Sequence, residues 1–264
     1  VNNAGISIYG RIAETPVEDA RQLFDTNYWG VVNGSLKAVR HLRQSGGVLI
    51  NIGSIVSDRA VPLQGHYSAS KHAVKAFTDA LRMELEEEGA PISVTLIKPA
   101  AIDTPFPEHA RNYMESEPTL PPPVYVPEEV ARAVLHCAER PKREISVGGG
   151  GRLMMAMGNV APRLTDRYME ASMFDMQKKD RPSRSGRTDS LYRPEHGSGR
   201  ERGDYEGHVM GSSLYTRAAL HPGLTLLGLA AFGLTMFLAN QRRGARERDL
   251  YALPRGSYRT ETEW

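Results

Sequence analysis

The chain has one cysteine, Cys137, among its 264 residues. A single thiol cannot form a disulfide within the chain, so a reducing compartment is the default expectation. The sequence also lacks cysteines and histidines at metal-finger spacing, and we predict no metal site. The formal net charge of +2 is too small to indicate a nucleic-acid partner, and we expect none. What is present is typical of a globular protein: 40% hydrophobic and 24% charged residues.

Strand-like and helix-like segments alternate over residues 1–150. The apolar runs at 46–57 and 92–100 have strand length and little two-residue alternation, which is typical of strands covered on both faces. Apolar residues at three- and four-residue steps predict a helix over 67–89. Another helix is expected from 16 to 44, and a further helix and strand follow Pro127. This order predicts an α/β fold with an open, doubly wound parallel sheet.

The last third of the chain differs in composition from an α/β domain expected over residues 1–177. Residues 178–215 are rich in Arg, Ser, Gly, Pro and Asp and predict a disordered polar linker. The 17 residues 223–239 carry no charge, so we expect a transmembrane or membrane-associated helix over 220–240 and a basic, polar tail over 241–264. An interfacial helix and a packing helix of the globular domain are the alternatives. The expected location is cytoplasmic and membrane-associated.

Tyr67 and Lys71 stand four residues apart near the start of the 67–89 helix, so their side chains share one face. A phenol with a pKa of about 10 exchanges protons poorly at neutral pH, and a lysine ammonium one turn away lowers that pKa. Ser54 lies near the end of the 46–57 apolar run. Ligands bind beyond the carboxyl ends of parallel strands, so Ser54 should meet Tyr67 at one crevice and hydrogen-bond a substrate oxygen there.

These residues belong to a larger set of motifs. The set comprises "NNAG" at 2–5, "NYWG" with Asn27, Ser54, "YSASK" at 67–71 and "PAAIDT" at 99–104. In order and spacing it resembles the classical short-chain dehydrogenases/reductases. The resemblance implies a Rossmann-like fold and an NAD(P)-dependent oxidoreductase that interconverts an alcohol and a carbonyl, as alcohol dehydrogenases and carbonyl reductases do.

The resemblance also implies a role for four residues. Tyr67 is the general acid/base, and Ser54 orients the reacting oxygen. Lys71 binds the nicotinamide ribose hydroxyls and lowers the pKa of Tyr67. Asn27 holds a water that links Lys71 to solvent in a proton relay.

The cofactor residues implied by the resemblance lie at two motifs. Asn3 would line the site beside the adenosine half, while the Ile102 backbone and the Thr104 hydroxyl would hold the nicotinamide carboxamide. The cofactor is NAD or NADP, with NADP favoured. One departure is Ala100, which stands where the family often has glycine and requires an ordinary backbone conformation.

The proline-rich insert between Thr104 and Pro127 corresponds to the substrate-covering loop of the resembling family. Its aromatic and aliphatic residues, such as Phe106 and Tyr113, indicate a small hydrophobic alcohol or carbonyl substrate. A homo-oligomer is also expected. A membrane-proximal enzyme acting on a lipid-like substrate is an extension that rests on residues 223–239 alone.

In the resembling family, "NNAG" closes the fourth strand, after the units that bind the cofactor phosphates. We therefore interpret the chain as an N-terminally truncated fragment with an incomplete sheet; the glycines at 148–151 follow the last strand rather than the first. Two alternatives to an active oxidoreductase remain. One is a non-catalytic, dehydrogenase-like scaffold or membrane-tethered binding protein. The other is a fragment inactive for lack of the phosphate site.

Overall fold

The computed structural model describes residues 1–184, 186–194, 199–228, 230–233 and 235–237. The chain divides into two compact units, Val1–Leu220 and His221–Trp264. Each unit is described by itself, and the first contains every residue predicted to take part in chemistry.

A three-stranded parallel sheet forms the centre of the first unit. Its strands lie in the order β2 (Gly47–Ile52), β3 (Ile92–Pro99) and β8 (Glu144–Val147). Asn2 continues the ladder on the other side of β2, where its N–H donates to the Ile50 carbonyl at 2.8 Å. The parallel sheet predicted from the apolar runs is therefore confirmed.

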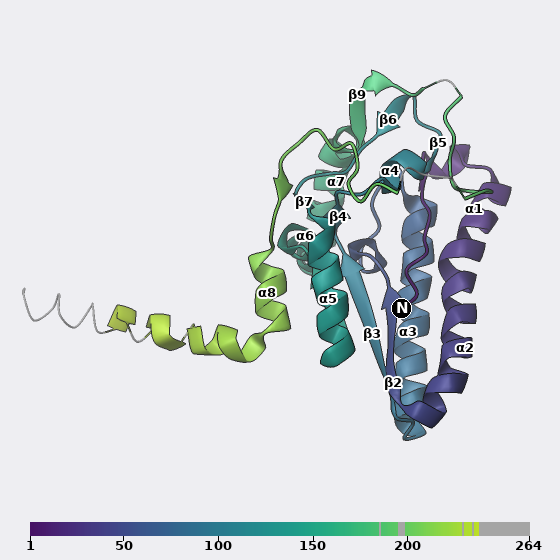
Figure 1. Ribbon diagram of the computed structural model, residues 1–264. Helices are drawn as coiled ribbons and strands as arrows, with labels where there is room; N and C mark the ends of the chain where they lie inside the picture. Colours follow the sequence, from purple (N-terminus) through teal and green to yellow (C-terminus); the bar gives the residue numbers. More distant parts are fainter. Residues whose placement is uncertain (185, 195–198, 229, 234, 238–264) are drawn as a thin grey trace, which may run out of the picture. The chain divides into compact units, whose positions relative to one another are not determined.

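Helices cover both faces of this sheet, α2 (Gly30–Ser45) and α3 (Gly65–Glu87) on one side and α5 (Pro127–Glu139) on the other (Figure 1). Successive residues of β2 point to opposite faces. Leu49 therefore joins the apolar cluster that includes residues of α2 and α3, and Ile50 joins the cluster that contains Cys137 of α5. The α/β class and the placement of Cys137 in the core are confirmed.

The helix expected over 16–44 contains an irregular turn. α1 (Val17–Phe24) runs through a π-helical turn, η2 (Asp25–Trp29), directly into α2. Asn27 lies in the middle of this turn and is completely buried. Wide turns of this kind are frequent at functional sites.

The remaining elements of the first unit are short or lie outside the central sheet. Three small sheets pair β1 with β5, β7 with both β4 and β10, and β6 with β9. The elements are β1 (Ile8–Tyr9), η1 (Ile12–Glu14), η3 (Ile55–Ser57), β4 (Ala101–Ile102), α4 (Phe106–His109), β5 (Arg111–Asn112), β6 (Ser116–Pro118), β7 (Val124–Tyr125), α6 (Gly149–Val160), α7 (Pro162–Met176), β9 (Lys178–Pro182), β10 (Val209–Met210) and α8 (Leu214–Leu220).

The segment 178–215, expected to be a disordered linker, packs against the domain where the structure describes it. β9 pairs with β6, and Leu191 is only 2% exposed. Arg187 pairs with Glu117 at 2.7 Å, and Arg200 pairs with Glu108 at 2.7 Å. The composition does not indicate this packing, because charged side chains make part of the contacts and are, in sequence, equally typical of a solvated chain.

The second unit contains a helical stretch within Pro222–Phe237. Large apolar side chains described in this stretch are exposed, including Leu224, Leu226, Leu227 and Phe232. Among the described residues no single helix is long and apolar enough to cross a membrane. The required length and hydropathy are reached only when α8 and Pro222–Phe237, which are separated by a break, are counted together. The membrane-associated helix over 220–240 stays a prediction, and the end of that range and the tail 241–264 lie outside the described residues.

Candidate active site

Tyr67 lies in the first turn of α3 and is 9% exposed. Its ring packs against Phe106 of α4, with 5.6 Å between the ring centroids. It belongs to a cluster of buried apolar residues that includes Val56 and Val61 of the loop after β2. The phenol therefore lies in apolar surroundings.

Lys71, one turn further along α3, is 3% exposed. Its ammonium donates a hydrogen bond to the Ile52 carbonyl at the end of β2, at 2.9 Å, and lies 5.8 Å from the centroid of the Tyr67 ring. The shared face predicted from the four-residue spacing is present in the structure.

Ser54 lies two residues beyond the end of β2 and begins the turn η3. Its hydroxyl accepts a hydrogen bond from the Val56 N–H at 3.3 Å and donates to the Pro99 carbonyl at 3.5 Å. Its own N–H donates to the Ser57 hydroxyl at 3.1 Å. The turn thus fixes Ser54 at the carboxyl ends of β2 and β3, the edge where open parallel sheets bind ligands.

Burial controls the protonation of the two central groups. It raises the pKa of Tyr67 to about 12, and a hydrogen bond with the Ser54 side chain lowers that pKa by less. Burial lowers the pKa of Lys71 to about 8. Lys71 was expected to bring the pKa of Tyr67 down. In this structure desolvation is the larger effect, so at neutral pH the site holds a neutral phenol beside an ammonium.

Asn27 connects the N-terminal segment to α3. Its side-chain oxygen accepts from the Ile6 N–H at 2.8 Å, and its amide donates to the Ile6 carbonyl at 2.9 Å and to the Ser70 hydroxyl at 3.1 Å. A Cβ on Gly5 would lie 3.5 Å from the Asn27 oxygen and 3.6 Å from the Lys71 nitrogen. Gly5, which was not among the predicted site residues, thereby leaves the space between Asn27 and Lys71 free of a side chain.

Comparisons with known proteins agree with this arrangement. The sequence profile described as short chain dehydrogenase matches residues 1–115. The uncharacterized oxidoreductase YxnA of Bacillus subtilis is 41% identical over 246 residues, which cover 92% of this chain and 68% of that protein. The dehydrogenase/reductase SDR family member 7B of Xenopus tropicalis is 33% identical over 178 residues, 65% of this chain and 57% of that protein. The chain belongs to the short-chain dehydrogenase/reductase family of oxidoreductases.

A solved member of this family supports the fold. A short-chain dehydrogenase from Burkholderia cenocepacia, crystallised in complex with NADP, superposes with a TM-score of 0.54 at 26% identity, covering 63% of this chain and 66% of that one. The Rossmann-like fold expected from the motifs is thereby confirmed.

The predicted cofactor residues of this short-chain dehydrogenase/reductase lie in two segments, one at the N-terminus and one after β3. Asn3 is exposed next to the Asn2 bridge with β2. Ile102 pairs with Tyr125 of β7, and the Thr104 hydroxyl donates to the Ile102 carbonyl at 3.4 Å. Their contacts with a cofactor stay a prediction.

Ala100 has an ordinary backbone conformation, as expected: among the described residues, Leu63 alone has a positive φ without being glycine. The glycines that begin α6 make room for its methyl group. A Cβ on Gly148 would lie 2.7 Å from the Ala100 Cβ, and one on Gly151 would lie 2.5 Å from the Ile55 side chain. The glycine run therefore serves close packing of α6 onto the turn after Ser54.

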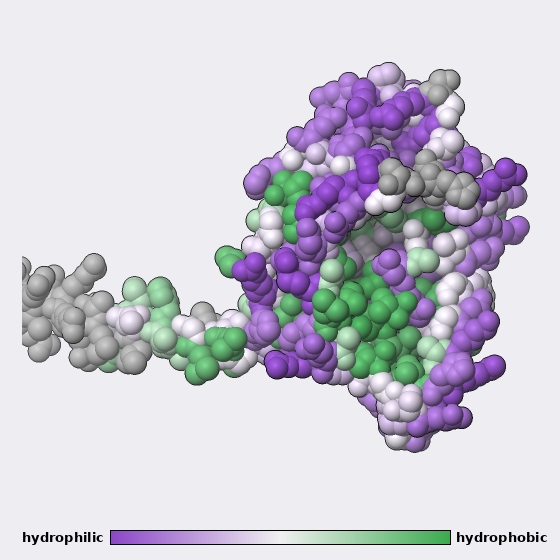
Figure 2. Space-filling view, in the orientation of Figure 1, coloured by the Kyte–Doolittle hydropathy of each residue, from purple (hydrophilic) through white to green (hydrophobic). Residues whose placement is uncertain are grey.

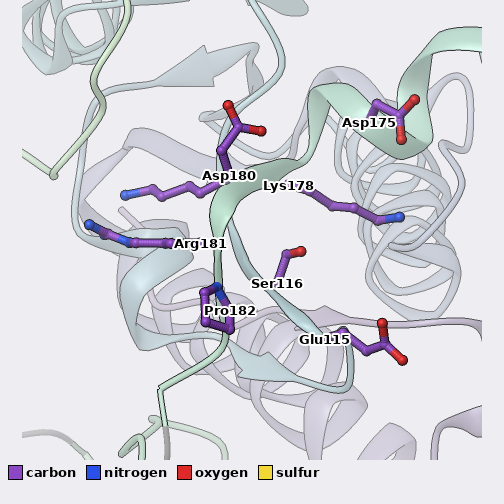
Figure 3. Close-up of a pocket in the computed structure, with 8 residues that line it drawn as sticks. Glu115, Ser116, Asp175, Lys178, Asp180, Arg181 and Pro182 are labelled. Atoms are coloured by element: carbon purple, nitrogen blue, oxygen red, sulfur yellow. The ribbon is translucent and has the colours of Figure 1, made fainter.

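A charged hollow of about 450 Å³ lies next to β9 (Figure 3). Carboxylate and cationic side chains both line it, among them Glu115, Asp175, Lys178 and Arg181. None of the residues predicted to take part in catalysis lines it, so it is separate from the Tyr67 site.

Proposed function

We propose that this protein reduces an apolar carbonyl compound to the alcohol with a nicotinamide dinucleotide, and that it catalyses the reverse reaction at higher pH. The observation that carries the proposal is the buried Tyr67–Lys71 pair beside Ser54, at the carboxyl ends of the central strands. In this proposal Tyr67 exchanges the proton and Ser54 hydrogen-bonds the reacting oxygen.

The protonation states favour reduction at neutral pH. Because burial raises the pKa of Tyr67 to about 12, the phenol is protonated at neutral pH and holds the proton that the oxygen of a carbonyl requires when hydride reaches its carbon. Alcohol oxidation requires the phenolate, which burial disfavours. We therefore expect oxidation to gain rate as pH rises.

The residues present fit a nicotinamide dinucleotide, which supplies or accepts hydride when bound. A lysine ammonium has three donors, and Lys71 gives one to the Ile52 carbonyl, which leaves capacity for ribose hydroxyls. Gly5 keeps the adjoining space free of a side chain. The cofactor of the Burkholderia protein makes NADP the first to test.

The proposed substrate class follows from the surroundings of Tyr67. The buried cluster around it consists of apolar side chains, with methionines of α7 and the partly buried Phe106 among them. Apolar surroundings of this kind favour an aliphatic or aromatic aldehyde, ketone or alcohol.

Replacing the phenol tests this function. Tyr67→Phe removes the exchangeable proton and keeps the ring, so NADPH- or NADH-dependent reduction of octanal should fall by about 10³-fold, in the range of general acid catalysis. Tyr168→Phe, on the exposed side of α7, is the matched control and should retain activity. Undiminished turnover by Tyr67→Phe, or no turnover by the wild type with either cofactor, would contradict the proposal; the second result would favour the scaffold or inactive-fragment alternatives.

We also propose that the second unit associates with membranes. The exposed leucines and phenylalanines within Pro222–Phe237 are followed in sequence by Arg242, Arg243, Arg246 and Arg248. Apolar side chains next to arginines suit a bilayer with anionic headgroups.

Vesicle sedimentation tests the association with the full chain. Leu227→Glu should weaken binding to phosphatidylcholine/phosphatidylglycerol vesicles by about tenfold or more, because a charge enters the apolar surface. Leu135→Glu places the same charge at an exposed leucine of α5 and should leave binding unchanged. Equal binding by the two variants would contradict the proposal.

A further inference from the structure

The buried cluster around Tyr67 includes a residue of the segment 178–215, which was predicted to be a linker. Residues 186–193, here called the strap, carry Leu191, which is 2% exposed and belongs to the same buried cluster as Tyr67. The other members of the cluster come from β1, α1, the loop after β2, α3 and α7. Leu191 is the contribution of the strap to the surroundings of the proposed proton donor.

The strap is fixed on both sides of Leu191. The Ser190 N–H donates to the His109 carbonyl at 2.8 Å, which joins the strap to the end of α4. The Tyr192 hydroxyl donates to the Asp19 carboxylate at 2.6 Å, and the Asp189 carboxylate accepts from the Leu191 N–H at 3.0 Å. Leu191 is therefore held in one position, as a residue that shapes a binding site must be.

A nearly buried cation anchors the strap to the segment that carries Phe106. The Arg187 guanidinium donates to the Glu117 carboxylate at 2.7 Å and to the Glu108 carbonyl at 2.6 Å, and it also contacts the Pro107 carbonyl. The Arg187 side chain is 12% exposed and that of Glu117 is 8% exposed. Phe106, which packs on the Tyr67 ring, therefore precedes two residues whose carbonyl groups the strap holds.

We propose that Leu191 is a specificity-determining residue that limits the length of the apolar chain a substrate places beside Tyr67. This inference rests on the proposed function and deepens it. Leu191 packs in the same buried apolar cluster as Tyr67, so truncating it would open room for a longer chain on that side of the cluster. One methylene in an apolar pocket is worth about tenfold or more in discrimination.

The experiment compares Leu191→Ala with Leu85→Ala in the full chain. Leu85 is 1% exposed but belongs to the separate cluster that contains residues of α2 and α3, so its truncation opens the same volume far from Tyr67. Saturation-transfer NMR measures the affinities of 1-butanol and 1-octanol without turnover, and the ratio of kcat/KM for octanal and butanal is measured alongside.

Leu191→Ala should raise the preference for the eight-carbon over the four-carbon ligand by about tenfold, and Leu85→Ala should leave it as in the wild type. If the alanine variant does not fold, Leu191→Val replaces it and should shift the preference in the same direction by a smaller factor. The inference is overturned if both truncations or neither shift the ratio, or if the wild type binds no alkanol. A wild type without nicotinamide-dependent turnover would refute the proposed function, while the binding ratio would still decide the role of Leu191.

Discussion

The base and the cover of the Tyr67 site are held by different interactions. The base consists of β2, β3 and α3, where parallel hydrogen bonds and buried aliphatic side chains fix Ser54, Tyr67 and Lys71. The cover consists of residues 105–117 and the strap, where ion pairs of Arg111 and Arg187 with carboxylates accompany a few apolar contacts. Figure 2 shows the same contrast on the surface, with apolar residues over β2 and β3 and hydrophilic residues around β6 and β9.

The contrast has a consequence for function. Tyr67 is 9% exposed, so a substrate reaches it only when part of its surroundings moves. Regions with few buried apolar contacts open at lower free-energy cost than a packed core. The cover is therefore the part expected to open, while the base keeps the reacting groups in place.

Removing the buried cation of the cover should have the largest effect on stability. Arg187→Gln removes the close cationic partner of the buried Glu117 carboxylate, which keeps only the hydrogen bond from the Arg184 N–H among its close contacts. The free energy of unfolding should fall by about 3 kcal/mol, as for other broken buried pairs. Arg184→Gln is the matched control: Arg184 lies 4.0 Å from Glu117 but its side chain is 66% exposed, so the loss should stay below about 0.5 kcal/mol. Urea denaturation measures both, and equal losses would show that burial of Arg187 is unimportant.

A smaller effect should appear in the base as a pH dependence. The pKa of Lys71 is lowered to about 8 from an ordinary value of 10.5, so between these pH values the unfolded chain binds more protons than the folded one. The free energy of unfolding contributed by Lys71 therefore rises with pH in this window. Above pH 10 the raised pKa of Tyr67 acts in the opposite direction, because the folded chain then keeps a proton that the unfolded chain releases.

Lys71→Met isolates this contribution, because Tyr67 is common to both chains. In urea denaturation, the unfolding free energy of the wild type should rise by about 2 kcal/mol relative to that of the variant between pH 8 and pH 10. Parallel pH profiles would show that the Lys71 ammonium is not destabilised by burial.

The base could be predicted from the sequence, and the family resemblance indicated that residues 105–117 cover the site, but the strap could not be predicted. Apolar runs identified β2 and β3, and the four-residue spacing placed Tyr67 and Lys71 on one face, because periodic apolar patterns directly encode burial. The contacts of Arg187 with Glu117 and of Tyr192 with Asp19 join residues far apart in sequence, and charged residues are equally typical of a solvated chain. The burial of Leu191 could not be predicted, since a single leucine in a polar segment forms no periodic apolar pattern. The raised pKa of Tyr67 could not be predicted from the sequence either, because it depends on how deeply the fold buries the phenol.

Native-state hydrogen exchange of the wild-type chain tests most directly whether base and cover are separate. The Ser190 and Tyr113 amides, bonded to the His109 and Tyr9 carbonyls, report on the cover. The amides of β3 report on the base. We predict that the cover amides exchange through an opening at least about 1.4 kcal/mol less costly than that of the β3 amides, a tenfold difference in protection. A single opening free energy shared by both sets would contradict this division of the site.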